Sequence, residues 1–85
     1  MILDYTLIIY RANTSIAKEE ALSIQNKLKP YESDVLILEA EDNSLSQIIK
    51  NQKKIPNLII VLGGDGTVLK AAKYFAPLKI PILSF

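Results

Sequence analysis

The sequence predicts an α/β domain in which strands and helices alternate as βαβαβαβ around a parallel sheet. Four short runs are rich in branched apolar residues, and three stretches between them show helical periodicity. The connections are short and are marked by Pro, Gly or small polar residues. This alternation favours right-handed crossovers, which place helices on both faces of an open sheet. The pattern leaves the order of the strands open.

The first strand and helix are predicted in the N-terminal third of the chain. The run from Tyr5 to Arg11 is continuously β-prone, which is typical of a strand buried on both faces. Asn13, Thr14 and Ser15 then offer helix caps, and Pro30 ends the helix. The apolar positions expected on its inner face are Ala17, Ala21, Ile24 and Leu28.

A second strand and a shorter helix are predicted next. Asp34 opens a second buried run, residues 35–38, and an acidic polar loop follows at 39–43. Ser44 is expected to cap the helix, and Pro56 closes the connection that comes after it. The apolar residues of this helix are Leu45, Ile48 and Ile49.

The third strand is predicted at Leu58 to Leu62, the third helix at Val68 to Ala76, and the fourth strand at residues 80–85. The third helix is expected to turn Lys70 and Lys73 outward. Its predicted inner face consists of Val68, Leu69, Ala72 and Phe75. Because the chain ends on an apolar strand, we expect it to be a fragment of a longer protein.

Composition limits the classes of function. The 85 residues are one domain at most, and 49% of them are hydrophobic, enough for a core. Lys and Arg number 10 against 9 acidic residues, so no net field favours nucleic acid or a membrane surface. There is no Cys or His, which excludes thiol nucleophiles and Cys/His zinc sites in this chain. The N-terminus is a poor signal peptide and no run could span a bilayer, so we expect a cytoplasmic protein.

The most informative segment is Gly63-Gly64-Asp65-Gly66-Thr67, between the third strand and the third helix. In open parallel sheets, ligands bind beyond the carboxyl ends of the strands, and unpaired amides at a helix start attract anions. Glycine lets the backbone approach a phosphate closely. The segment is neither a P-loop nor a Rossmann fingerprint, which needs a third glycine where Leu69 stands.

The acid among these glycines narrows the chemistry. A carboxylate beside phosphates costs about 1 kcal/mol per charge pair at 4 Å in water, and more when buried. Two roles of Asp65 would offset that cost. It could contact Mg²⁺ that bridges phosphate oxygens, or it could accept the proton of a hydroxyl that attacks a phosphoryl group. Both uses describe phosphotransfer from a nucleotide.

Structural explanations for the same residues stay open at this point. Asp-Gly is a common turn, an acid near a helix start is favourable without function, and Thr67 could be the N-cap of the third helix. Arg11, at the end of the first strand, is either a phosphate contact or a solvated strand end. Lys70 and Lys73 suit a solvated helix face.

The glycine segment matches the GGDGT motif of a kinase superfamily. That superfamily contains NAD kinases, diacylglycerol and sphingosine kinases and, with Ser for Thr, 6-phosphofructokinases. Lipid kinases usually continue with Asn-Glu after this motif, whereas the continuation here resembles that of NAD kinases. Residues 80–83, Ile-Pro-Ile-Leu, also resemble an NAD kinase strand. Ser84 differs from the Gly that the family commonly has next. The continuation reads Val68-Leu69-Lys70-Ala71-Ala72-Lys73.

The resemblance implies a Rossmann-like N-terminal domain and an activity. The parent enzyme would phosphorylate the 2′-hydroxyl of the adenosine ribose of NAD, giving NADP, with ATP or polyphosphate as donor and Mg²⁺ or another divalent cation. Asp65 would approach that hydroxyl as general base or as the group that orients it. Thr67 and the amides of Gly63, Gly64 and Gly66 would hold donor phosphates and Mg²⁺.

The resemblance also implies what lies outside this chain. Residues 1–85 would be part of a nucleotide-phosphate-binding domain, without the family's Asn-Glu/Asp motif and β-rich C-terminal domain. The chain alone would then be inactive, and the parent is expected to be a homo-oligomer. The alternatives are a non-catalytic nucleotide-binding module or an inert fragment and, less favoured, a lipid kinase.

Overall fold

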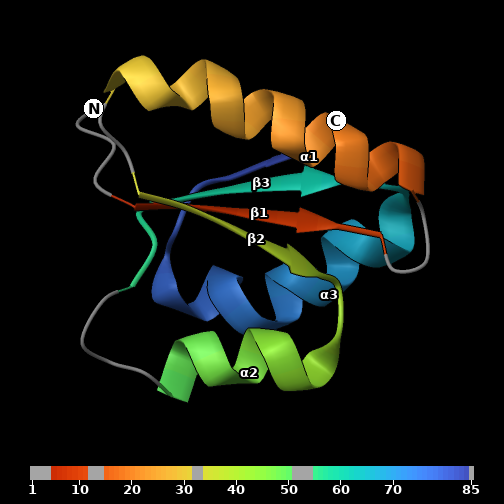
Figure 1. Cartoon of the computed structure of the whole chain (residues 1–85). Helices are drawn as coiled ribbons and strands as arrows, with labels where there is room; N and C mark the ends of the chain where they lie inside the picture. Colours follow the sequence, from red (N-terminus) through yellow and green to blue (C-terminus); the bar gives the residue numbers. More distant parts are fainter. Residues whose placement is uncertain (1–4, 12–14, 32–33, 51–54, 85) are drawn as a thin grey trace.

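The predicted alternation is present in the computed structural model, which describes residues 5–11, 15–31, 34–50 and 55–84 (Figure 1). The elements in chain order are β1 (Tyr5–Tyr10), α1 (Ser15–Leu28), β2 (Asp34–Glu39), α2 (Asp42–Lys50), β3 (Leu58–Leu62), α3 (Asp65–Phe75) and β4 (Ile82–Ser84). Short 3₁₀ turns follow α1 and α3, at Lys29–Tyr31 (η1) and Ala76–Leu78 (η2). No helix in these ranges has the length and apolar character of a membrane span.

All strand pairs are parallel, and their order in the sheet is β2-β1-β3-β4. The chain moves one way from β1 to β2, then passes back across β1 to reach β3. Right-handed crossovers therefore put α1 on one face and both α2 and α3 on the other, as Figure 1 shows. The connections after β1 and β3 leave toward opposite faces, which opens a crevice at the carboxyl ends of these two strands.

The sheet separates two apolar cores. Leu7 and Ile9 of β1 face α2 and α3, whereas Ile8 and Tyr10 face α1. Every residue of β1 and of β3 is buried. The prediction that the first run is buried on both faces is confirmed for Tyr5–Tyr10, whereas Arg11 is exposed. The third strand is buried in the same way, and the central places of both strands in the sheet explain it.

The prediction of a buried second strand is wrong in part. No residue of β2 is fully buried: Asp34 and Leu36 are exposed, the other four are half-buried, and Leu36 is 36% exposed. The reason is the strand order, because β2 lies at the edge of the sheet and pairs only with β1. An apolar run does not show whether its strand is central or at an edge.

The predicted face of α1 is confirmed, since Ala17 and Ala21 are buried and Ile24 and Leu28 pack on the α1-side core. The caps proposed at Asn13 and Thr14 lie outside the described residues, and Ser15 is the first residue of the helix.

Helix α2 carries the predicted apolar residues, with Leu45 fully buried, but the expected cap at Ser44 is wrong. The helix begins at Asp42, and the amide of Leu45 donates to the carbonyl of Glu41 at 3.0 Å. That bond makes Glu41 the capping position.

Helix α3 begins at Asp65, three residues before the predicted start at Val68. Its buried positions are Thr67, Ala71 and Phe75, and Leu69, predicted to face inward, is 70% exposed. Phe75 is confirmed on the inner face, and Val68 packs against the core. Thr67 and Ala71 take the buried positions that the prediction gave to Leu69 and Ala72, because the predicted helix began three residues too late and left Thr67 out.

Thr6 on β1 is fully buried, and its hydroxyl has no hydrogen-bond partner within the part of the chain described. An unsatisfied buried hydroxyl costs about 1–3 kcal/mol. We therefore expect Thr6→Val, which keeps the branched shape, to raise the free energy of unfolding by about 1 kcal/mol, seen as a higher thermal midpoint. Thr6→Ser, which keeps the hydroxyl and loses a methyl group, should lower the midpoint. A Thr6→Val variant no more stable than the wild type would contradict the interpretation.

Candidate functional site

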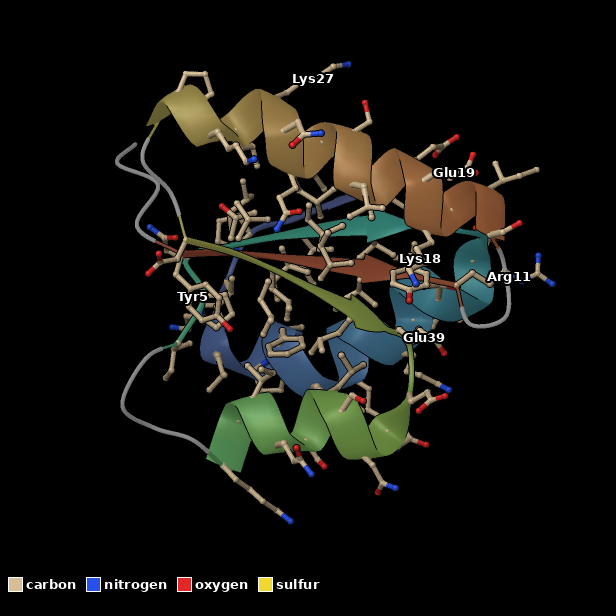
Figure 2. All side chains as sticks on the ribbon, in the orientation of Figure 1. Tyr5, Arg11, Lys18, Glu19, Lys27 and Glu39 are labelled. Carbon is tan, nitrogen blue, oxygen red and sulfur yellow. The ribbon has the colours of Figure 1, made fainter. Side chains whose placement is uncertain are left out.

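A pocket of about 630 Å³ lies at the carboxyl ends of β1 and β3. It is lined by Arg11, Ala40, Gly64, Gly66, Thr67 and Lys70. Backbone bonds of 2.9 Å hold the strand ends together, from the amide of Arg11 to the carbonyl of Leu62 and from the amide of Ala40 to the carbonyl of Tyr10. Figure 2 shows Arg11 and Glu39 at this edge of the sheet, with Tyr5 at the opposite one. The pocket therefore occupies the crevice that the reversal of strand order opens.

Gly63 makes the turn from β3 into α3, with φ +151°. A Cβ built at this position would lie 2.8 Å from Thr67 Oγ1 and 3.1 Å from Arg11 Cβ. Both the dihedral angle and the close approach exclude a side chain here. Gly63 therefore lies next to two residues that line the pocket, Thr67 and Arg11, but does not line it itself.

The start of α3 presents amides to the pocket. Gly64 is the N-cap, and its carbonyl accepts from the amides of Thr67 at 3.0 Å and Val68 at 3.2 Å. The amides of Asp65 and Gly66 have no acceptor within residues 5–11, 15–31, 34–50 and 55–84. Two free donors at a positive helix end can hold an oxyanion.

The pocket's lining residues include two cations and no carboxylate. Arg11 is exposed, and Lys70 is half-buried, with its Nζ donating to the carbonyl of Ala40 at 3.3 Å. Asp65 is exposed in the first turn of α3 and does not line the pocket, although the glycines on both sides of it do. The site therefore combines a positively charged pocket with an acid next to it.

A side-chain hydrogen bond joins α2 and α3 one helical turn after Lys70. Tyr74 Oη donates to Asp42 Oδ1 at 2.8 Å, which links α3 to the first residue of α2. This bond is the main reason that the pKa of the Asp42 carboxyl is lowered, with smaller contributions from the charges of Lys70 and Lys73. The same bond raises the pKa of Tyr74. Lys70 and Tyr74 thus hold the β2–α2 connection against α3.

The structure brings together four of the six predicted binding residues, Arg11, Gly64, Gly66 and Thr67. Gly63 and Asp65 adjoin the pocket without lining it. The alternative that Thr67 is the N-cap is wrong, because Gly64 holds that position and Thr67 is buried in the first turn.

Sequence reasoning missed two residues of the pocket, Lys70 and Ala40. Lys70 was assigned to a solvated helix face. Once the helix starts at Asp65, however, Gly66 and Lys70 are four residues apart and share a face. Ala40 reaches the pocket only because β2 pairs with β1, and nothing in its own sequence neighbourhood indicates this.

Comparison with known proteins gives a consistent result. The family model described as "ATP-NAD kinase N-terminal domain" matches residues 6–85. The chain is 42% identical over 80 residues to NAD kinase 1 of Prochlorococcus marinus strain NATL2A, covering 92% of this chain and 26% of that protein. It is 42% identical over 86 residues to NAD kinase 1 of Parasynechococcus marenigrum, covering 99% of this chain and 27% of that protein.

A more distant relative is the NAD kinase of Methanosphaera stadtmanae, 35% identical over 82 residues, with 96% of this chain and 25% of that protein covered. No solved structure gave a significant match. The chain spans about a quarter of the length of these curated relatives. The family match extends over almost the whole chain and confirms the resemblance inferred from the glycine motif. The chain belongs to the ATP-NAD kinase N-terminal domain family.

Proposed function

We propose that this chain is the donor-phosphate half of an NAD kinase, which phosphorylates the 2′-hydroxyl of the adenosine ribose of NAD to give NADP. The observation that carries the proposal is the positively charged pocket beside the glycine loop, in a chain of the ATP-NAD kinase family. Free amides, Arg11 and the absence of a lining carboxylate suit a phosphate chain as ligand.

The glycine loop and Arg11 would bind the donor. The amides of Asp65 and Gly66 need acceptors, and the donor's phosphate oxygens supply them. An ideal Cβ at Gly64 or Gly66 meets no atom within 4 Å, so a phosphate can approach the backbone there. Arg11 would pair with the same oxyanions from the end of β1.

The chief role of Asp65 would be to act on the acceptor hydroxyl. Its side chain is exposed and it does not line the pocket, so a carboxylate there avoids most of the repulsion from donor phosphates. In this position it would accept the proton of the 2′-hydroxyl as the hydroxyl oxygen bonds to phosphorus and the donor's bridging oxygen leaves.

The residues present fit Mg²⁺ only as a partner of the donor. The described residues contain no group of three or more carboxylate, His or Cys side chains that could hold a metal. Mg²⁺ commonly keeps water ligands and binds through one or two protein oxygens plus substrate phosphates. Asp65 and the Thr67 hydroxyl are the candidate protein oxygens, and the ion would neutralise charge on the phosphate chain.

The remainder of the enzyme would come from outside this chain. We propose that residues 1–85 form part of a nucleotide-phosphate-binding domain, and that a β-rich C-terminal domain supplies much of the dinucleotide site. The 85-residue chain alone would then lack activity, and the whole enzyme would be a homo-oligomer that uses ATP or polyphosphate.

The deciding experiment gives the longest product of the gene γ-labelled ATP, Mg²⁺, NAD and diacylglycerol together. Label in NADP is the expected result. Label in the lipid would instead make the protein a lipid kinase. Nucleotide binding without transfer of label would indicate a non-catalytic module.

A further inference from the structure

We infer that Lys70 is a further binding residue of this site, one that recognises the phosphoanhydride chain of the donor and so selects polyphosphates over monophosphates. The inference rests on the proposed function and adds a residue outside the GGDGT segment. Lys70 lines the pocket four residues after Gly66, on the same face of α3.

The ammonium group of Lys70 is only partly satisfied. It donates a single hydrogen bond within the described residues, to the carbonyl of Ala40 at 3.3 Å, beyond the usual range for such bonds. An ammonium carries three donors, so two are free for a ligand. Its nearby carboxylate, Asp42, is already engaged with Tyr74 at 2.8 Å.

The position of Lys70 along the pocket suggests which part of the ligand it meets. The free amides lie in the first turn of α3 and can hold one phosphate group. Lys70 lies one turn further along the helix, about 5–6 Å from that turn. Successive phosphorus atoms of a phosphoanhydride chain are closer together than one helical turn, and two links of the chain span about that length. The third phosphate of a chain held on the amides would therefore reach the ammonium, while a lone phosphate would stay on the amides.

Lys73 provides a matched control. It is on the same helix, three residues on, but it is exposed, does not line the pocket, and places its Nζ over the Tyr74 ring at 5.4 Å from the centroid. Lys70→Met and Lys73→Met thus remove the same charge from the same helix. They differ in whether the ammonium reaches the pocket.

The test measures dissociation constants of ATP, tripolyphosphate and AMP by calorimetry, on the longest product of the gene and on both variants. We expect Lys70→Met to weaken ATP and tripolyphosphate about 10–100-fold and AMP no more than about threefold, because only the longer chains meet the ammonium. Lys73→Met should leave all three constants near the wild-type values, and Lys70→Arg should restore part of the loss. Unchanged thermal midpoints would show that the fold is intact.

Each other outcome overturns the inference in a distinct way. Equal ATP affinity for Lys70→Met and Lys73→Met would show that Lys70 does not contact the donor. Weaker binding of ATP without weaker binding of tripolyphosphate would show that Lys70 contacts the nucleoside and not the phosphate chain. If the wild type binds neither ATP nor tripolyphosphate, the proposed function fails as well, which a failure of Lys70 alone does not produce.

Discussion

Asp65→Asn in the longest product of the gene is expected to lower kcat for NAD phosphorylation by roughly 10²–10⁴. The substitution keeps the size and shape of the side chain and removes its basicity. The KM for the phosphate donor should stay near the wild-type value, because Asp65 does not line the pocket that would hold the donor. A loss in kcat with donor KM preserved is the kinetic signature of a group that acts in the transition state.

The control for this prediction is Asp42→Asn. Asp42 is the first residue of α2 as Asp65 is the first residue of α3, so both variants lose an acid at a helix start. Asp42 does not line the pocket, and its carboxylate bonds to Tyr74. Asp42→Asn should therefore lower the thermal midpoint and spare kcat. Near-normal turnover in Asp65→Asn would reduce Asp65 to a helix-start residue without a catalytic role.

Gly63→Ala is expected to be the most damaging glycine substitution in the loop. The backbone at φ +151° costs a side chain on the order of 1–3 kcal/mol, and the new Cβ would stand 2.8 Å from Thr67 Oγ1. Relief of that contact must move Thr67 or Arg11, both of which line the pocket. We expect a lower thermal midpoint together with a loss of donor binding.

Gly66→Ala is the matched comparison, and its two effects should have opposite signs. Gly66 is helical, its φ is not positive, and an added Cβ meets nothing within 4 Å. Ala should therefore stabilise the unliganded protein by about 0.4–1 kcal/mol, while its methyl group intrudes on the space for the phosphate. A higher midpoint with weaker ATP binding is the expected pair of results. Unchanged ATP binding would place the phosphates elsewhere.

Gly64→Ala separates two reasons for a glycine at that position. Gly64 has φ −86°, so its backbone does not require glycine, and close approach of a ligand is the reason that remains. Weaker ATP binding in Gly64→Ala is the expected result. The difference from Gly63 could not be read from the sequence, because both residues lie in the same short turn and their backbone angles depend on how α3 leaves the sheet.

The sequence was most informative where one element determines its own environment. β3 is apolar throughout and β1 is β-prone throughout, with Thr6 as its one polar position, and both strands are buried. The glycine motif does lie beside a pocket, because the carboxyl end of a parallel strand followed by a helix start is a local feature. These predictions needed no knowledge of which strands are neighbours.

The sequence was least informative where a residue's surroundings depend on the order of the strands in the sheet. β2 is half-exposed because it is an edge strand, and Ala40 reaches the pocket because β2 lies beside β1. Lys70 was missed for a different reason, since its place in the pocket depends on the helix starting at Asp65, and glycine-rich starts give little propensity signal.

The central place of β1 has a consequence for the protein during its synthesis. The amide of Tyr5 bonds to the side chain of Asn57, 52 residues later, and β1 cannot pair on that side until β3 has left the ribosome. At about 5–20 residues per second, this strand waits roughly 3–10 s with one edge open. The arrival of β3 also brings the glycine loop to Arg11. A nascent chain that lacks β3 therefore has neither a continuous sheet nor the pocket. Under the proposed function, capture of ATP would report that the centre of the sheet has formed.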